Sequence, residues 1–149
     1  MSKPAEFWRQ AMAQGMGQTA FLRALGGELV DFKKGIGRLR LPWSENLVGN
    51  PKTGVVHGGV ITAMLDQACG MAIGSALEEP MGMATLDLRI DYMKPATPRE
   101  DIFIESECLK VTREIAFARG RAYHTSIDEP IAIATGTFML MKFTRPETH

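Results

Sequence analysis

The residues in this sequence best suited to chemistry are the triplet His57-Gly58-Gly59 and the acid Asp66, nine residues after His57. Between residues 60 and 77, Asp66 is the only formally charged residue in a largely apolar stretch. An ionised carboxylate is rarely buried without a partner, because its desolvation costs several kcal/mol. A fold that keeps one there is expected to use it.

The two glycines stand where the apolar stretch is predicted to begin as a helix. The first N–H groups of a helix have no acceptor within it, and they lie at the positive end of its dipole. Because Gly58 and Gly59 have no side chains, these groups stay accessible as an oxyanion-type donor site. Such a donor, together with a carboxylate that acts as base or nucleophile, meets the minimal requirements for acyl transfer.

The helix face that carries Asp66 is predicted to be lined by small residues. At about 100° per residue, the positions within about 60° of Asp66 are Gly59, Thr62, Ala63, Cys69 and Gly70. The opposite face carries the bulkier core residues Val60, Ile61, Met64, Ala68, Met71 and Ala72. Two interpretations stay open: a tight packing seam in which hydrogen bonds hold Asp66, or a surface that a substrate or a partner subunit approaches closely.

The rest of the sequence is dominated by strand patterns. Alternation of apolar and polar residues predicts strands near residues 28–32, 36–41, 86–92, 102–111, 115–124 and 131–142. In the third of these, Leu86, Leu88, Ile90 and Tyr92 are predicted to share one face. Residues 4–25 predict one or two short helices on the outside, and residues 43–56 predict a loop. The short polar connections between the last three strands indicate an antiparallel meander.

A long helix that is apolar nearly all round must be covered on most sides. The sequence therefore predicts an α+β fold, in which a curved antiparallel sheet of about six strands wraps around one long central helix. Residues 1–149 are expected to form a single domain, with residues 1–25 as an N-terminal helical segment. Such a sheet leaves its edges and one flank of the helix open, so we expect a homo-oligomer.

The overall composition argues against several classes of function. The formal net charge is zero, with 17 basic and 17 acidic residues, which gives no reason to expect a nucleic acid or an anionic membrane as partner. The two cysteines, Cys69 and Cys108, form no disulfide framework, and together with three histidines they lack the spacing of a zinc site. We therefore expect no metal and no cofactor. No secretory signal is visible after Met1, so a cytoplasmic location is expected.

These residues resemble the hotdog-fold thioesterase superfamily, and within it the small acyl-CoA thioesterases related to the phenylacetate-pathway thioesterase. The resemblance covers roughly residues 45–141. It is carried by the segment NPKTGVVHGGV at residues 50–60 with Asp66, and by the segment TLDLRIDYMKPA at residues 85–96. The second segment is similar to the strand that follows the central helix in that group. The resemblance implies a hotdog fold and the hydrolysis of an aliphatic or aryl acyl-CoA thioester.

The resemblance also implies roles for five residues. Asp66 is the catalytic carboxylate, which either attacks the thioester carbonyl or activates a water molecule. The Gly58 N–H polarises that carbonyl, and Thr85 helps to place water beside the acid. His57 braces the turn, with a purely structural or a chemical role both open. Asn50 is similar to a loop asparagine near the thioester, although it lies seven residues before His57 where the family pattern has six.

In this family the active site lies across a dimer interface, with the helix-start donor and the carboxylate supplied by different subunits. Both a dimer and a dimer of dimers are compatible with the sequence. The residues predicted to contact the acyl-CoA substrate are Gly59, Gln67, Met93, Lys94 and Arg113. A basic patch of Lys94, Arg99, Arg113 and Arg121 would suit the phosphates of coenzyme A, although each is also explained as an ordinary solvated charge. The methionines form an adaptable acyl pocket or fill gaps in the core.

Two other functions are compatible with the pattern. A hotdog hydratase or dehydratase uses a histidine and an acid as an acid–base pair, but no histidine closely follows Asp66 and a His-Phe-Pro-Gly signature is absent. A non-catalytic acyl-thioester binding protein would share the pocket and lack the turnover.

Overall fold

The computed structural model of the chain describes residues 6–7, 10 and 19–143. Helix α2 spans Ala20–Leu25; the Thr19 hydroxyl oxygen caps its start by accepting a hydrogen bond from Leu22 N–H. Gly26 ends this helix in the left-handed conformation, with φ 75°. The helix confirms one of the short helices predicted for residues 4–25, and most of the remainder of that prediction lies outside the described residues.

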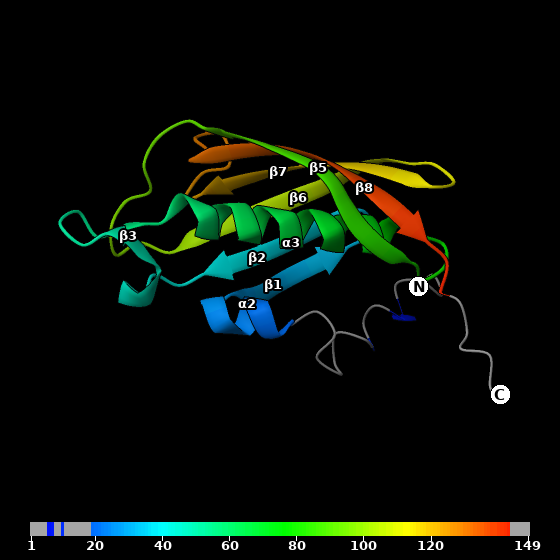
Figure 1. Cartoon of the computed structure of the whole chain (residues 1–149), viewed down its shortest axis with the longest axis horizontal. Coiled ribbons are helices and arrows are strands. Elements are labelled where there is room, and N and C mark those ends of the chain that lie inside the picture. Colours follow the sequence, from blue (N-terminus) through cyan, green and yellow to red (C-terminus); the bar gives the residue numbers. More distant parts are fainter. Residues whose placement is uncertain (1–5, 8–9, 11–18, 144–149) are drawn as a thin grey trace.

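The sheet is built from six strands. They are β1 (Glu28–Lys33), β2 (Ile36–Leu41), β5 (Gly82–Tyr92), β6 (Ile102–Val111), β7 (Ile115–Tyr123) and β8 (Ala132–Met141). All neighbours are antiparallel, in the order β1–β2–β6–β7–β8–β5, so that β1 and β5 form the two edges (Figure 1). This order confirms the predicted strands and the predicted meander of the last three.

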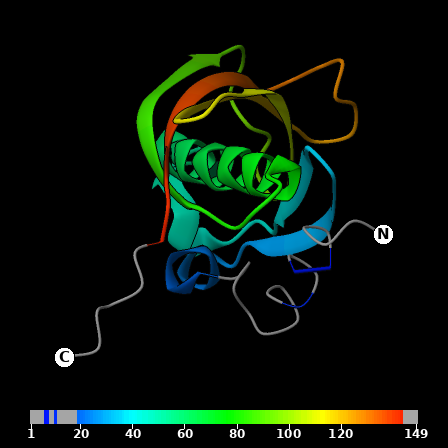
Figure 2. The same ribbon diagram turned by 90° about the vertical axis from the view of Figure 1, so that its right-hand side faces the viewer.

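The long helix α3 (Gly58–Ala76) lies in the concave face of the sheet, and the end-on view in Figure 2 shows the strands curving around it. The sheet approaches the helix closely because small residues line its inner face. A Cβ atom on Gly37 of β2 would lie 3.0 Å from the carbonyl oxygen of Ala68 on α3. Buried alanines continue this inner surface on β7 and β8, namely Ala116, Ala118, Ala122, Ala132 and Ala134. The predicted α+β architecture is confirmed.

The side-chain alternation predicted for residues 86–92 is wrong at one position. Leu88 and Ile90 are partly buried and pack against the core, whereas Leu86 is 52% exposed. The reason is a shift in the register between β5 and β8, which falls between Thr85 and Asp87. This bulge changes the parity of the strand, and it turns Thr85 toward α3.

The segment predicted as a loop at residues 43–56 contains further structure. It holds a short 3-10 helix, η1 (Glu45–Leu47), and a two-stranded ribbon of β3 (Val48–Asn50) and β4 (Val55–Val56). The ribbon leads directly into α3 and so fixes how the chain enters the helix (Figure 1). Among the helices of the described part of the chain, none combines the length and the apolar character needed to cross a membrane.

Candidate active site

Helix α3 begins at Gly58 because His57 caps it. His57 Nδ1 accepts a hydrogen bond from Gly59 N–H at 2.8 Å, and His57 O accepts one from Val60 N–H at 3.0 Å. A neutral imidazole whose Nδ1 accepts a hydrogen bond carries its proton on Nε2. None of the hydrogen bonds within the described ranges uses Gly58 N–H. Gly58 N–H is therefore the donor that stays free at the start of the helix.

Two glycines leave room for the His57 residue. A Cβ atom on Gly59 would lie 2.9 Å from His57 Nδ1, and one on Gly49 would lie 3.1 Å from His57 Cα. The backbone of His57 is also held, because its N–H donates to Leu47 O at 2.8 Å. Capping and packing together hold the His57 residue in a fixed position at the turn before α3.

A second contact fixes the helix start from the side of the sheet. The Tyr92 hydroxyl, at the end of β5, donates to Gly58 O at 2.6 Å and lies 2.6 Å from Thr62 Oγ1. The Thr62 hydroxyl lies 3.2 Å from the same Gly58 carbonyl. Neither Tyr92 nor Thr62 is among the site residues that the sequence predicts. Tyr92 and Thr62 are 30 residues apart in the sequence. No pattern of residue spacing predicts a contact between a helix and a strand over such a separation.

Asp66 lies two turns further along α3 and is partly buried. Thr85 Oγ1, on β5, donates to Asp66 Oδ1 at 2.7 Å, and this is the one side-chain hydrogen bond within the described residues that reaches the carboxylate. One turn beyond Asp66, a Cβ atom on Gly70 would meet nothing within 4 Å. The helix face beside the acid is thus open in the single chain, which favours a surface that another molecule approaches over a sealed packing seam.

Cys69 does not belong to this open face, contrary to the predicted helix stripe. Its side chain is fully buried, and its thiol donates to Ser106 Oγ at 3.6 Å. Burial raises the pKa of the Cys69 thiol to about 11, so the group stays protonated and unreactive near neutral pH. The open face around Asp66 therefore keeps the other small residues of the predicted stripe and excludes Cys69.

Gly58 and Asp66 are too far apart to act together within one chain. Eight residues of helix place them ~12 Å apart along its axis, at ~1.5 Å per residue. A donor and an attacking group must each come within ~3 Å of the reacting carbonyl. One copy of α3 alone does not bring both groups to the same carbonyl.

A pocket of about 450 Å³ opens beside Gly58. The ribbon strand β4, the end of β5 and the following residues line it. Two of the predicted substrate-binding residues, Met93 and Lys94, lie in this wall, and Met93 is 55% exposed. Gly59, also predicted to bind substrate, is exposed at the adjoining helix start. The structure thus brings three of the predicted residues together at the free donor.

The other predicted residues lie elsewhere. Asn50 is at the end of β3, where its Oδ1 accepts a hydrogen bond from Lys52 N–H at 3.0 Å and shapes the turn before β4. Gln67 is partly exposed beside Asp66 on α3. Arg113 is in the β6–β7 turn, at the end of the sheet where α3 terminates (Figure 1).

The four-residue basic patch predicted for coenzyme A is not formed within one chain. Lys94 lies by the start of α3 and Arg113 lies at the opposite end of the sheet. Arg121 lies on the outer face of the sheet beside Glu105 and Glu107. Within the described ranges, no group of three or more histidine, cysteine, aspartate or glutamate side chains is arranged to hold a metal ion.

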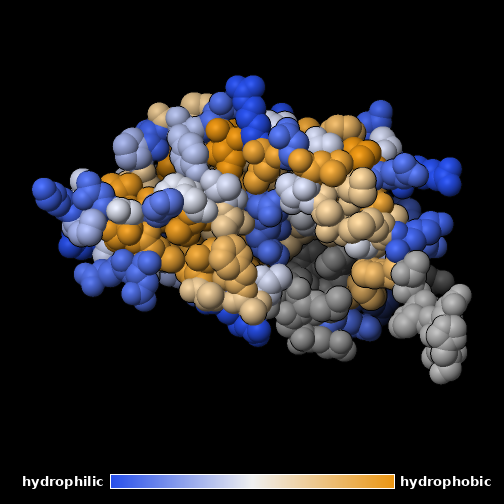
Figure 3. All heavy atoms as spheres, viewed as in Figure 1, coloured by the Kyte–Doolittle hydropathy of each residue, from blue (hydrophilic) through white to orange (hydrophobic). Residues whose placement is uncertain are grey.

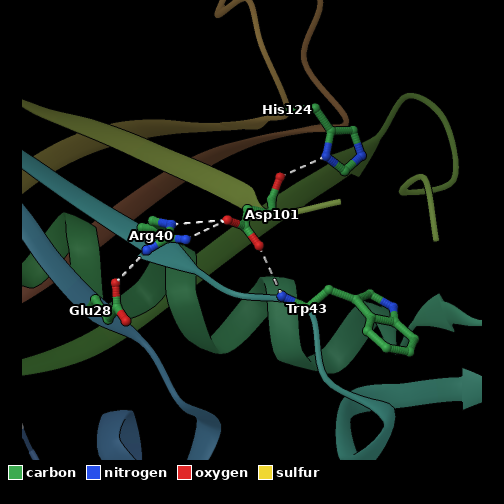
Figure 4. A network of polar contacts seen from close by, with 5 residues as sticks. All are labelled: Glu28, Arg40, Trp43, Asp101 and His124. Carbon is green, nitrogen blue, oxygen red and sulfur yellow. Dashed lines mark hydrogen bonds and ion pairs between the residues drawn. The ribbon is translucent and has the colours of Figure 1, made fainter. Parts of the chain in front are cut away.

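A network of polar contacts centred on Asp101 supports the loops next to this pocket (Figure 4). Asp101 Oδ2 accepts hydrogen bonds from Arg40 Nε at 3.0 Å and Nη2 at 2.6 Å, and Oδ1 accepts one from Trp43 N–H at 3.3 Å. The hydrogen bonds from Arg40 hold the pKa of Asp101 below its ordinary value of 3.8. Glu28 binds the other side of the Arg40 guanidinium at 2.9 Å.

His124 joins this network through the backbone. Its Nε2 accepts a hydrogen bond from Thr97 N–H at 2.8 Å, and its Nδ1 lies 2.8 Å from Asp101 O. With Nε2 as acceptor, Nδ1 carries the proton and donates to that carbonyl. His124 therefore connects Thr97 and Asp101 within the segment that follows Lys94.

Comparison with known proteins decides the family. The family model described as Thioesterase superfamily matches residues 53–131, a range that contains Gly58, Asp66 and Thr85. The chain belongs to this superfamily. The protein is therefore a thioester hydrolase. The medium/long-chain acyl-CoA thioesterase YigI of Escherichia coli is 34% identical over 133 residues, which cover 80% of this chain and 84% of YigI.

Solved structures of several proteins share the fold. A Pseudomonas aeruginosa protein is 38% identical, with a TM-score of 0.77 over 93% of this chain and 99% of that one. A thioesterase family protein from Silicibacter pomeroyi is 25% identical, with a TM-score of 0.80 over 91% and 99% of the two chains. The Escherichia coli PaaI protein, from the phenylacetic acid degradation operon, is 17% identical with a TM-score of 0.80 over 96% and 97%. The predicted hotdog fold is confirmed.

Proposed function

We propose that this thioesterase hydrolyses acyl-CoA thioesters to a free acid and coenzyme A, with Asp66 as the catalytic carboxylate and Gly58 N–H as the oxyanion donor. The observation that carries the proposal is the free N–H of Gly58, a residue that lines a pocket at the start of the same helix that carries Asp66. The similarity to YigI supports acyl-CoA as the substrate class.

The chemistry needs no other reacting group. The thioester carbonyl oxygen accepts a hydrogen bond from Gly58 N–H, which stabilises the negative charge of the tetrahedral intermediate. Asp66 either removes a proton from an attacking water, or attacks the carbonyl carbon and forms an anhydride that water then hydrolyses. In both routes the carbon–sulfur bond breaks, coenzyme A leaves as the thiol after gaining a proton, and the acyl group leaves as the acid.

We further propose that the two groups come from different copies of the chain. The ~12 Å between Gly58 and Asp66 along one helix requires a second source for one of them. Strand β5 is an edge strand, and Leu86, Tyr92 and Met93 on and beside it are 52%, 50% and 55% exposed. Hydrophobic side chains gather on this face in Figure 3. An exposed apolar edge beside an open helix face favours a homodimer joined here, either alone or within a dimer of dimers.

The first experiment measures thiol release from a panel of acyl-CoA substrates, with medium- and long-chain acyl groups first and aryl groups after them. We expect Asp66→Asn to lower kcat by ~10² or more, since the amide neither accepts a proton nor attacks the carbonyl. The exposed Asp128, in the β7–β8 turn, provides Asp128→Asn as the matched control. Full activity of Asp66→Asn would remove Asp66 from the mechanism, and tight acyl-CoA binding without thiol release would favour a binding protein.

The donor is tested by a substitution that deletes a single N–H. Gly58 is the first helical residue, where proline is tolerated because that N–H has no partner in the helix. His57, with ψ 132°, already has the conformation that a following proline requires. We expect Gly58→Pro to lower kcat by ~10²–10³, whereas Gly58→Ala, which places a Cβ at the same point and keeps the N–H, retains most activity.

Mixing the two inactive variants tests the shared site. Refolded together, Asp66→Asn and Gly58→Pro chains form mixed dimers with one intact pair of groups, so about a quarter of wild-type activity should return. If donor and acid acted within one chain, mixing would restore nothing. Each variant refolded alone is the control.

A further inference from the structure

A second hollow, of about 430 Å³, lies beside the ribbon that leads to α3. Its wall includes Trp43, Lys52, Gly54 and Arg99. None of these residues takes part in the chemistry proposed above. The hollow is therefore a feature of the molecule that the catalytic groups leave unexplained.

The charge of this hollow suits an anion. Lys52 and Arg99 contribute two positive charges, and Glu45 contributes one negative charge. Neither Lys52 nor Arg99 is among the ion pairs formed within the described residues, whereas Arg38 and Arg40 on β2 each bind two carboxylates. Two cations without a carboxylate partner on one concave surface favour a ligand with several negative charges, such as phosphates.

Arg99 is held in an unusual conformation. Its φ is 63°, and no other non-glycine residue within the described ranges has a positive φ. This backbone region is costly for a residue with a side chain, and such strain concentrates at functional sites. The guanidinium lies 5.7 Å from the centre of the Trp43 ring, at cation–π distance. The surrounding structure thus directs this cation over the aromatic ring.

Trp43 is itself fixed from two sides. Its backbone N–H donates to Asp101 Oδ1 at 3.3 Å, and its indole Nε1–H donates to Gly54 O at 2.9 Å. Asp101 is anchored in turn by two hydrogen bonds from Arg40 (Figure 4). The ring and the cation over it are therefore positioned before any ligand arrives, which lowers the entropic cost of binding.

The hollow lies within reach of the proposed donor. Gly54 lines the hollow and Gly58 lines the catalytic pocket, and Val55 and Val56 between them also line that pocket. Four residues of extended chain span at most ~14 Å. The pantetheine arm of coenzyme A, which joins the thioester to the nucleotide, has a comparable length when extended.

We propose that this hollow, lined by Trp43, Lys52 and Arg99, binds the phosphates of the nucleotide end of coenzyme A. The proposal rests on the acyl-CoA thioesterase function proposed above. Arg99 and Lys52 pair with the phosphate oxygens, and the Trp43 ring holds the guanidinium in place. Arg99 belongs to the larger basic patch that the sequence predicts; the compact site keeps Arg99 and adds Lys52 and Trp43.

The test compares two substrates that share the reacting thioester and differ in the nucleotide. We expect Arg99→Gly, which removes the cation and suits the left-handed backbone, to raise KM for acyl-CoA about tenfold with little change in kcat. Lys52→Ala should act in the same direction, and the double variant should show a larger rise. For the acyl-pantetheine of the same acyl group, all three variants should match the wild type. Lys110→Ala, an exposed lysine at the far end of β6, is the matched control.

Two results would overturn the site. One is an unchanged KM for acyl-CoA in the double variant; the other is an equal rise for acyl-CoA and acyl-pantetheine, which would assign the effect to the catalytic pocket. Calorimetry with 3′-phosphoadenosine 5′-diphosphate gives a readout that does not depend on turnover: the wild type should bind it, and the double variant should bind it about tenfold more weakly or worse. If the wild type hydrolyses neither substrate, the proposed function fails, and this binding measurement still decides the nucleotide site.

Discussion

Thr85 Oγ1 donates a 2.7 Å hydrogen bond to Asp66 Oδ1, and a bulge in β5 makes this contact possible. In a regular strand, side chains an odd number of positions apart point to opposite faces. Thr85 would then face away from Leu88 and Ile90, which pack against the core. The register shift between Thr85 and Asp87 reverses this parity and directs Thr85 to the helix.

Removing the Thr85 hydroxyl should leave the carboxylate of Asp66, the proposed catalytic group, less well oriented. In Thr85→Ala, Asp66 loses the hydrogen bond that sets its orientation, and we expect kcat to fall about tenfold, equivalent to ~1.4 kcal/mol of transition-state stabilisation. Thr85→Ser keeps the hydroxyl and should retain activity within a factor of about two. The measurement is steady-state hydrolysis of the best acyl-CoA substrate. Equal rates for the alanine variant and the wild type would show that Asp66 is oriented by other means.

The bulge shows which part of the fold the sequence could predict. Alternation located β5 correctly, because most of its apolar residues do face the core. It failed at Leu86, because the extra residue that a bulge inserts leaves no mark in a pattern of apolar and polar residues. The Thr85 contact came from the family resemblance, and strict alternation argued against it.

Tyr92 should stabilise the start of α3. In Tyr92→Phe the hydroxyl that binds Gly58 O and lies against Thr62 Oγ1 is absent, and we expect the free energy of unfolding to fall by about 1 kcal/mol. Because the same contact positions the peptide next to Gly58 N–H, kcat should also decrease a fewfold. The control is Tyr123→Phe, since the Tyr123 hydroxyl makes no hydrogen bond within the described residues. Chemical unfolding and hydrolysis rates for both variants check this prediction.

The residues of the candidate site likewise include some that the sequence could predict and some that it could not. His57, Gly58 and Asp66 could be found from the sequence because a helix relates them at fixed spacing. Tyr92 and Thr62 could not, since tertiary packing alone joins them. The prediction for Cys69 is wrong because the positions within about 60° of Asp66 include one that faces the sheet and Ser106.

The capping role of His57 can be separated from a chemical one. An asparagine at this position can accept a hydrogen bond from Gly59 N–H, as Asn does at many helix starts, whereas alanine cannot. We expect His57→Ala to lose about 1 kcal/mol of stability and His57→Asn to lose much less. If His57 only braces the turn, activity should follow stability, and His57→Asn should remain active. A stable but inactive His57→Asn would assign the imidazole a direct role in the reaction, as hydrolysis and thermal unfolding of the two variants would reveal.

The pair between Asp101 and Arg40 should make stability depend on pH in the acid range. Hydrogen bonds from Arg40 hold the pKa of folded Asp101 below its ordinary value of 3.8. The stabilisation is therefore fully present above that value, and it is lost as the pH falls through the lower pKa of the folded state. We expect Asp101→Asn to be less stable than the wild type at pH 7, with the difference shrinking at acid pH, because the wild-type carboxyl then also becomes neutral. Urea unfolding at a series of pH values measures this, with Asp128→Asn as the control. A difference between Asp101→Asn and the wild type that stays constant down to the lowest pH would show that the effect comes from shape and not from charge.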